Sequence, residues 1–264
     1  MLTGILVGLV SLFALVALSL LILHKTRKIH LATYQLLAAA RETQTLFSQI
    51  QSLLALERQL DLDKPLPPLR GWAGSPDFLL RLSNEILDRK PQVVMECSSG
   101  VSTVVIARSL QLNGQGRAYS LEHELEFVKK TRKLLEAHGL SNWAQIIHAP
   151  LETENTGTPW YAERDIPGDL PPIDLLVVDG PPATTATLAR YPALPRLADR
   201  LNEYAVIIAD DTNRKDETEM IRRWLESFPA AQATNCHCEK GCMLIELNHA
   251  VGEESWHRAR PLGG

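Results

Sequence analysis

A short apolar run in residues 91–107, followed at once by an acid and several small residues, constrains the fold more than any other part of the chain. The run, Val-Val-Met at residues 93–95, is typical of a strand buried on both faces of a parallel sheet. Glu96 closes it, the next four residues are small turn-formers, and Ser102 and Thr103 can cap an apolar helix. An open α/β sheet presents a ligand site at the carboxyl end of its first strand with this order of strand, turn and helix.

The residue types in the turn indicate which ligand such a site would take. A dinucleotide site needs G-x-G-x-x-G, so that bare backbone approaches a pyrophosphate, and here only Gly100 is present. The carboxylate of Glu96 would repel phosphate but suits an ammonium group beside a positive sulfur. Glu122 follows about 20 residues later, where such folds bind ribose hydroxyls. S-adenosylmethionine fits this description; the alternative from these residues alone is an ordinary βαβ unit whose acids cap helices or face solvent.

Three motifs resemble those of class I S-adenosylmethionine-dependent methyltransferases, and the likeness covers about residues 69–247. The motifs are Glu96-Cys-Ser-Ser-Gly-Val-Ser-Thr103, Tyr119-Ser-Leu-Glu-His123 and Asp174-Leu-Leu-Val-Val-Asp-Gly-Pro-Pro182. The resemblance implies a Rossmann-like, doubly wound α/β sheet, mostly parallel. One departure is Ser98, which stands where the family usually has glycine (E/D-x-G-x-G). The implied cofactor-binding residues are Glu96, Ser98, Gly100, Ser102, Thr103, Glu122 and His123, with Trp72 and Ser75 as weaker candidates ahead of the first strand.

Acidic residues follow two further strands of the expected sheet. Asp179 follows the apolar strand at residues 173–178, and Asp210 and Asp211 follow the one at residues 204–209. Three carboxylates at one rim are costly unless a positive charge offsets them, and Mg²⁺ prefers oxygen ligands. The pattern resembles catechol O-methyltransferase and the macrocin-type sugar O-methyltransferases. That resemblance implies that all three bind the metal and that Asp179 and Asp210 are catalytic. The alternative is that Asp179 contacts cofactor or caps the next helix, while Asp210 or Asp211 caps the helix at residues 212–219.

The C-terminal part of the chain predicts an antiparallel hairpin of two strands around Lys240-Gly241. Cys236, Cys238 and Cys242 crowd into it, but their spacing differs from that of a zinc site. Alternation along a strand predicts that these side chains point to opposite faces and serve as buried small hydrophobes. With Cys97 they are read as reduced thiols rather than as a disulfide framework.

The N-terminal 23 residues contain no charged residue and are long enough to cross a membrane as a helix. The basic residues that follow, at 24–28, predict by the positive-inside rule that the rest of the chain is cytoplasmic. A cleaved signal peptide is the alternative, although the start of the chain lacks its positive charge. We therefore expect a single-pass membrane protein with its catalytic domain in the cytoplasm.

Residues 29–62 lack glycine and proline, which predicts one long helix, and the charged, proline-rich residues 61–68 form a linker after it. The helix could form a parallel coiled coil that joins two copies; the alternative is a helix that packs on its own domain or lies along the membrane. The expected domains are an anchor with its basic flank (1–28), a helical stalk (29–64) and a methyltransferase domain (65–264). The predicted seam consists of Ala39, Thr43, Leu46, Ile50, Leu53, Glu57 and Leu60.

The remaining features bound the function. A net charge of −4 provides no basic field for nucleic acid. The polar loop at residues 152–172 predicts a substrate lid or an ordinary surface excursion. We expect a methyltransferase that modifies oxygen on a sugar, glycan or other small hydroxylated acceptor at a membrane. A degenerate scaffold of a membrane complex and a metal-independent N- or C-methyltransferase are the alternatives, and His148, His123 and Tyr191 join Asp179 as candidate general bases.

Overall fold

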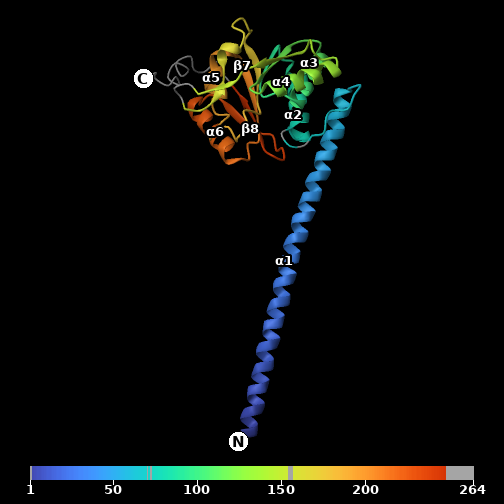
Figure 1. The fold of residues 1–264 in the computed structure, drawn as a ribbon, viewed down its shortest axis with the longest axis vertical. Helices are drawn as coiled ribbons and strands as arrows, with labels where there is room; N and C mark the ends of the chain where they lie inside the picture. Colours follow the sequence, from blue (N-terminus) through green and yellow to red (C-terminus); the bar gives the residue numbers. More distant parts are fainter. Residues whose placement is uncertain (1, 70, 72, 154–156, 248–264) are drawn as a thin grey trace. The chain divides into compact units, whose positions relative to one another are not determined.

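The computed structural model describes residues 2–69, 71, 73–153 and 157–247 (Figure 1). The chain divides into two compact units, Met1–Ser48 and Gln49–Gly264. Helix α1, Leu2–Leu60, contains all of the first unit except Met1 and the first residues of the second. The second unit holds the sheet and the other helices.

A seven-stranded sheet with the order β3-β2-β1-β6-β7-β9-β8 forms the centre of the second unit. β1, β2, β3, β6 and β7 are parallel, whereas β9 runs antiparallel to β7 and β8 antiparallel to β9. This confirms the predicted Rossmann-like sheet with its antiparallel C-terminal hairpin. The strands are β1 (Val93–Cys97), β2 (Arg117–Glu122), β3 (Ala144–His148), β6 (Ile173–Val178), β7 (Leu201–Asp210), β8 (Gln232–Asn235) and β9 (Cys242–Glu246).

The central position of β1 explains why its sequence is apolar throughout. All five of its residues are buried, because β2 and β6 flank it and helices cover both faces. The chain builds the sheet outward from β1 in one direction through β2 and β3, and then continues on the other side through β6 and β7. The boundary between β1 and β6 is therefore the switch point, where open α/β sheets place their ligands.

Two hydrophobic cores lie on the two faces of the sheet. α2, α3 and α4 contribute to the first core, and α5 and α6 to the second. The bounds are α2 (Pro76–Arg89), α3 (Val101–Asn113), α4 (Leu125–Ala137), α5 (Ala193–Leu197) and α6 (Lys215–Ser227).

The segment predicted as a lid folds against the second core. β4 (Leu151–Glu152) and β5 (Trp160–Tyr161) form a small antiparallel sheet, and 3₁₀ turns cover Glu163–Asp165 and Ala198–Arg200. Both residues of β5 are buried in that core. The two aromatic side chains therefore anchor this segment to the domain.

The prediction of a membrane anchor with a cytoplasmic domain is wrong. Among the described residues, no helix is long and apolar enough to cross a membrane. The apolar run of the first 23 residues forms no element of its own. It is the beginning of the 59-residue helix α1, which continues without a break through the basic residues Lys25, Arg27 and Lys28.

The structure does not support the predicted coiled coil. Leu60, predicted in the seam, is fully buried together with Leu56 in the core that α2 and α3 share. Leu46 and Ile50, also predicted in the seam, are exposed. The last turns of α1 thus pack on their own domain, as the alternative interpretation stated, and dimerisation through residues 29–62 stays a prediction.

Candidate functional site

The predicted site residues gather at the carboxyl ends of the central parallel strands. β1 ends at Cys97, β6 at Val178 and β7 at Asp210, and these strands are neighbours in the sheet. The backbone N–H of Asp179, directly after β6, donates to the carbonyl of Cys97 at the end of β1 over 3.3 Å. The sequence-derived candidates therefore share one rim of the sheet, at its switch point.

The turn after β1 has the conformation that glycine favours, although it begins with serine. Ser98 has φ 134° and Gly100 has φ 153°. The N–H of Ser98 donates to the carbonyl of Leu121 on β2 over 3.1 Å, which fixes the start of the turn. A side chain in this region of φ is strained by about 1–3 kcal/mol. The departure of Ser98 from the family pattern thus changes the residue but keeps the turn.

Glu96 organises the interior behind this turn. Its carboxylate accepts hydrogen bonds from Ser102 (2.5 Å) and Thr103 (2.7 Å) on α3, and from Ser120 (2.5 Å) on β2. The side chain is fully buried, and burial raises its pKa to about 7 despite these three donors. Glu96 therefore joins β1, β2 and the start of α3, and the hydroxyls of Ser102 and Thr103 are turned toward it. Direct contact of these residues with a cofactor stays a prediction.

Glu122, at the end of β2, lies beside the same turn. One carboxylate oxygen accepts from the Ser99 hydroxyl over 2.8 Å, and the other from the N–H of Glu124 over 2.9 Å and faces His123 Nδ1 at 3.1 Å. Burial alone would raise the pKa of Glu122, but the hydrogen bonds from His123, the Glu124 N–H and Ser99 hold it below the ordinary value. Glu122 is thus a carboxylate kept ionised beside the turn, as a ribose-binding role requires.

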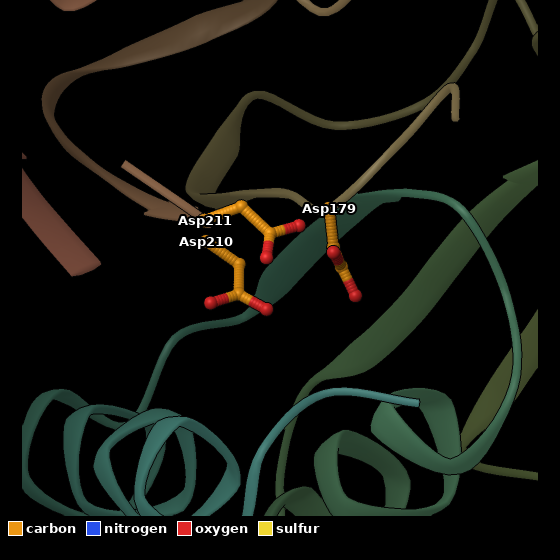
Figure 2. Close-up of side chains that lie close together, drawn as sticks. All are labelled: Asp179, Asp210 and Asp211. Atoms are coloured by element: carbon orange, nitrogen blue, oxygen red, sulfur yellow. The ribbon is translucent and has the colours of Figure 1, made fainter. Parts of the chain in front are cut away.

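Three aspartates converge at the ends of β6 and β7 (Figure 2). Asp179, Asp210 and Asp211 offer carboxylate oxygens that all lie within 4.8 Å of one another. Successive residues of a strand point to opposite faces, so Asp210 and Asp211 would be separated if the strand continued. Asp211 instead follows the strand with φ 62°, a left-handed conformation that aspartate tolerates. This conformation places the carboxylate of Asp211 near that of Asp210.

A buried arginine, which the sequence interpretation missed, accompanies the aspartates. Arg190 Nη2 lies 2.9 Å from Asp211 Oδ2 and 3.3 Å from Asp179 Oδ1, and its Nε lies 3.7 Å from Glu217 Oε1. It also donates to the carbonyl of Asp210 over 3.2 Å. Three carboxylates at one rim are costly unless a positive charge lies among them. Arg190 provides one within the chain.

The positive charge on the chain does not fully offset the carboxylates. Arg214 adds a second guanidinium, 2.8 Å from Asp211 Oδ2, but Asp179, Asp210, Asp211 and Glu217 carry four negative charges when ionised. Burial raises the pKa of Asp179 and of Asp210, and the neighbouring carboxylates raise both further against the effect of Arg190. The site therefore favours an additional positive charge or a bound proton.

The donor set fits a hard divalent cation. Among the described residues, Oδ1 of Asp210 and Oδ1 of Asp211 are buried oxygens without a hydrogen-bond partner. Unpaired buried carboxylate oxygens are costly, and Mg²⁺ or a similar ion takes such ligands. The aspartates could thus bind a metal ion beside Arg190, although Arg190 already occupies one oxygen of Asp211.

The remaining candidates have different positions. Ser75 is buried just before α2, and its hydroxyl donates to Asp77 over 2.6 Å. Trp72 lies outside the described residues. Tyr161 was not predicted as a site residue, yet a Cβ on Gly180 would come within 2.8 Å of its hydroxyl and within 3.0 Å of Cβ of Ser98. Its phenol therefore lies at the switch point between the turn after β1 and the residues after Asp179.

Comparison with known proteins agrees with this geometry. Residues 96–212 match the family described as a methyltransferase domain, a range that includes both the turn after β1 and the aspartates. No curated protein matches the sequence.

Solved structures of several methyltransferases share the fold. An S-adenosylhomocysteine-bound methyltransferase from Podospora anserina is similar with a TM-score of 0.52 and 15% identity, over 74% of this chain and 87% of that one. A methyltransferase from Geobacter sulfurreducens has a TM-score of 0.51 and 15% identity, over 76% and 89% of the two chains. An O-methyltransferase from Bacillus cereus in complex with S-adenosylhomocysteine has a TM-score of 0.51 and 18% identity, over 76% and 90%. Residues 96–212, which hold the turn after β1 and the aspartates, thus match a methyltransferase domain, and the second unit has the fold that these solved methyltransferases share.

Proposed function

We propose that the chain transfers a methyl group to a hydroxyl oxygen of a sugar or another small hydroxylated acceptor, with a divalent cation at Asp179, Asp210 and Asp211. One observation carries this proposal: three carboxylates within 4.8 Å of one another lie at the ends of β6 and β7, next to the switch point of the sheet. Oxygen is the acceptor atom whose activation gains most from such a site, because a hydroxyl must lose its proton to become a good nucleophile.

The residues of the turn and of β2 would hold the cofactor. S-adenosylmethionine supplies a methyl group activated by a positive sulfur. The positive φ at Ser98 and Gly100 would let the backbone of the turn approach the ligand, and the ionised Glu122 would accept hydrogen bonds from ribose hydroxyls. His123 lies beside Glu122 and the Tyr161 ring, so it would border the ribose end of the cofactor site.

Asp179 and Asp210 would accept the proton that the acceptor hydroxyl loses. In the transfer, the acceptor oxygen forms a bond to the methyl carbon, the carbon–sulfur bond breaks, and its electron pair stays on sulfur. The hydroxyl proton must leave the oxygen, and a carboxylate whose pKa is raised by burial is suited to accept it near neutral pH. A divalent cation held by the three aspartates would lower the pKa of a hydroxyl bound to it.

The test is methyl transfer from methyl-labelled S-adenosylmethionine to a panel of sugars and other hydroxylated compounds, with amines as a comparison. We expect labelled ethers, loss of transfer when a chelator is added, and loss in Asp210→Asn. Glu226→Gln on the exposed side of α6 removes the same charge away from the site and should keep full transfer. Transfer to amines alone, or transfer that resists both chelator and Asp210→Asn, would contradict the proposal.

Metal-independent transfer is the second candidate, and Arg190 is the observation that favours it. The guanidinium already bridges Asp179 and Asp211 and could orient these carboxylates without an ion. Manganese binding measured by electron paramagnetic resonance separates the two candidates. The first predicts one bound ion in the wild type and in Glu226→Gln but none in Asp210→Asn, whereas the second predicts no bound ion in any of them.

A further inference from the structure

Three cysteines gather in the β8–β9 hairpin. Asn235 pairs with Met243 in the ladder, so Cys236 and Cys242 are the next opposed residues, and the N–H of Cys236 donates to the carbonyl of Cys242 over 2.9 Å. Directly opposed residues of an antiparallel pair project from the same face of the sheet. The sequence interpretation considered alternation along each strand, whereas the register between β8 and β9 is what places Cys236 opposite Cys242.

The positions of Cys236 and Cys242 suit a disulfide. Opposed residues that share backbone hydrogen bonds have Cα atoms about 5.5 Å apart, within the roughly 4.4–6.8 Å that a disulfide spans. The thiol of Cys242 interacts with the thiols of both Cys236 and Cys238, and all four cysteines of the chain are free. One buried thiol thus has two neighbouring thiols on the same hairpin.

Cys236 is the thiol best placed to react. It is partly exposed, whereas Cys238, Cys242 and Cys97 are buried. The interaction with Cys242 lowers the pKa of Cys236 to about 7, with help from the guanidinium of Arg81 and against the effects of burial and of Glu85. Burial raises the pKa of Cys97, which leaves that thiol protonated and inert.

We propose that Cys236 and Cys242 form a reversible thiol–disulfide pair that is oxidised by hydroperoxides. The Cys236 thiolate attacks the O–O bond, keeps one oxygen as a sulfenic acid, and releases the other as an alcohol or water after protonation. The Cys242 sulfur then attacks the sulfenic sulfur, the S–S bond forms, and water leaves with the Cys242 proton. The two thiols lose two electrons, and the hydroperoxide gains them.

This pair lies beside the acidic cluster. Cys242 is opposed to Asp210 in the β7–β9 ladder. The turn that joins β8 and β9 also supports the loop after Asp211, because the carbonyls of Gly241 and Lys240 accept from the N–H groups of Thr212 (3.2 Å) and Asn213 (3.1 Å). The disulfide would therefore cross-link the hairpin that holds one wall of the site.

The experiment treats the reduced full-length protein with one equivalent of tert-butyl hydroperoxide, blocks remaining thiols by alkylation, and analyses a tryptic digest without reductant. Lys240 lies between the two cysteines, so trypsin yields two peptides that only the disulfide holds together. We expect a Cys236–Cys242 cross-link that dithiothreitol removes. Its initial rate should rise about tenfold from pH 6 to pH 8, as the thiolate fraction does for a pKa near 7.

Single cysteine-to-serine substitutions show which two cysteines form the disulfide. Cys236→Ser and Cys242→Ser should abolish the cross-link, and Cys238→Ser, which changes the neighbouring thiol on the same tryptic peptide, should retain it. Alkylated Cys97 serves as the internal control for an unreactive thiol. Absence of a cross-link in the folded wild type, a cross-link that survives Cys236→Ser, or one that is lost in Cys238→Ser would each overturn the assignment.

Discussion

The buried carboxyl of Glu96 predicts a specific dependence of stability on pH. Its pKa is raised by burial from 4.5 to about 7, so the folded protein keeps the proton where the unfolded chain has lost it. The contribution of the Glu96 carboxyl to the free energy of unfolding is fully present below pH 4.5. It falls as pH rises toward 7, and above 7 it is lost. At about 1.4 kcal/mol per pH unit, this rise in pKa corresponds to a loss of about 3 kcal/mol.

Glu96→Gln isolates this contribution. Glutamine keeps the shape of the side chain and can bond to the hydroxyls of Ser102, Thr103 and Ser120, but it cannot ionise. The free energy of unfolding, from urea titrations followed by tryptophan fluorescence at several pH values, should therefore shift by about 3 kcal/mol in favour of the variant between pH 4.5 and pH 8. For Glu226→Gln, the plot of the free energy of unfolding against pH should run parallel to that of the wild type. A Glu96→Gln curve that also runs parallel would refute the assignment of a protonated, buried carboxyl.

Two further predictions concern the site itself. Arg190→Met leaves Asp211 and Glu217 without their buried guanidinium, so the free energy of unfolding should fall by about 3–5 kcal/mol, whereas Arg190→Lys should lose less. Urea denaturation of both variants checks this, and equal losses would speak against the ion-pair geometry. Ser98→Gly removes a side chain from a residue with φ 134° and should raise the melting temperature without loss of cofactor binding, measured by differential scanning fluorimetry with and without S-adenosylhomocysteine. A lower melting temperature would mean that the Ser98 side chain stabilises the turn.

The sheet could be predicted because its strands are buried on both faces. β1 and β6 are almost entirely apolar, and a parallel strand in this position has no solvent-facing side that would interrupt the run. The acids at the strand ends then follow from the topology, since the carboxyl ends of parallel strands share one rim. This is why Asp179 and Asp210 could be placed together from the sequence alone.

Residues whose roles depend on tertiary contacts could not be predicted. Arg190 lies in an irregular segment, and only the folded chain shows that its guanidinium enters the acidic cluster. The three hydroxyls around Glu96 come from α3 and β2, and the β1–β2 register that opposes Glu96 to Ser120 is not visible in either segment. The same holds for Cys236 and Cys242. The prediction of a membrane anchor was wrong because it rested on the apolar composition of the first 23 residues, which are the start of the longer helix α1.

Binding of S-adenosylhomocysteine to the full-length chain tests the central claim most directly. Isothermal titration calorimetry should show one molecule bound per chain with micromolar affinity, and at least tenfold weaker binding for Glu122→Gln, because the amide lacks the charge that strengthens hydrogen bonds from ribose hydroxyls. Glu226→Gln should bind as the wild type does. If the wild type shows no binding, or if Glu122→Gln binds equally well, the site described here is not the cofactor site.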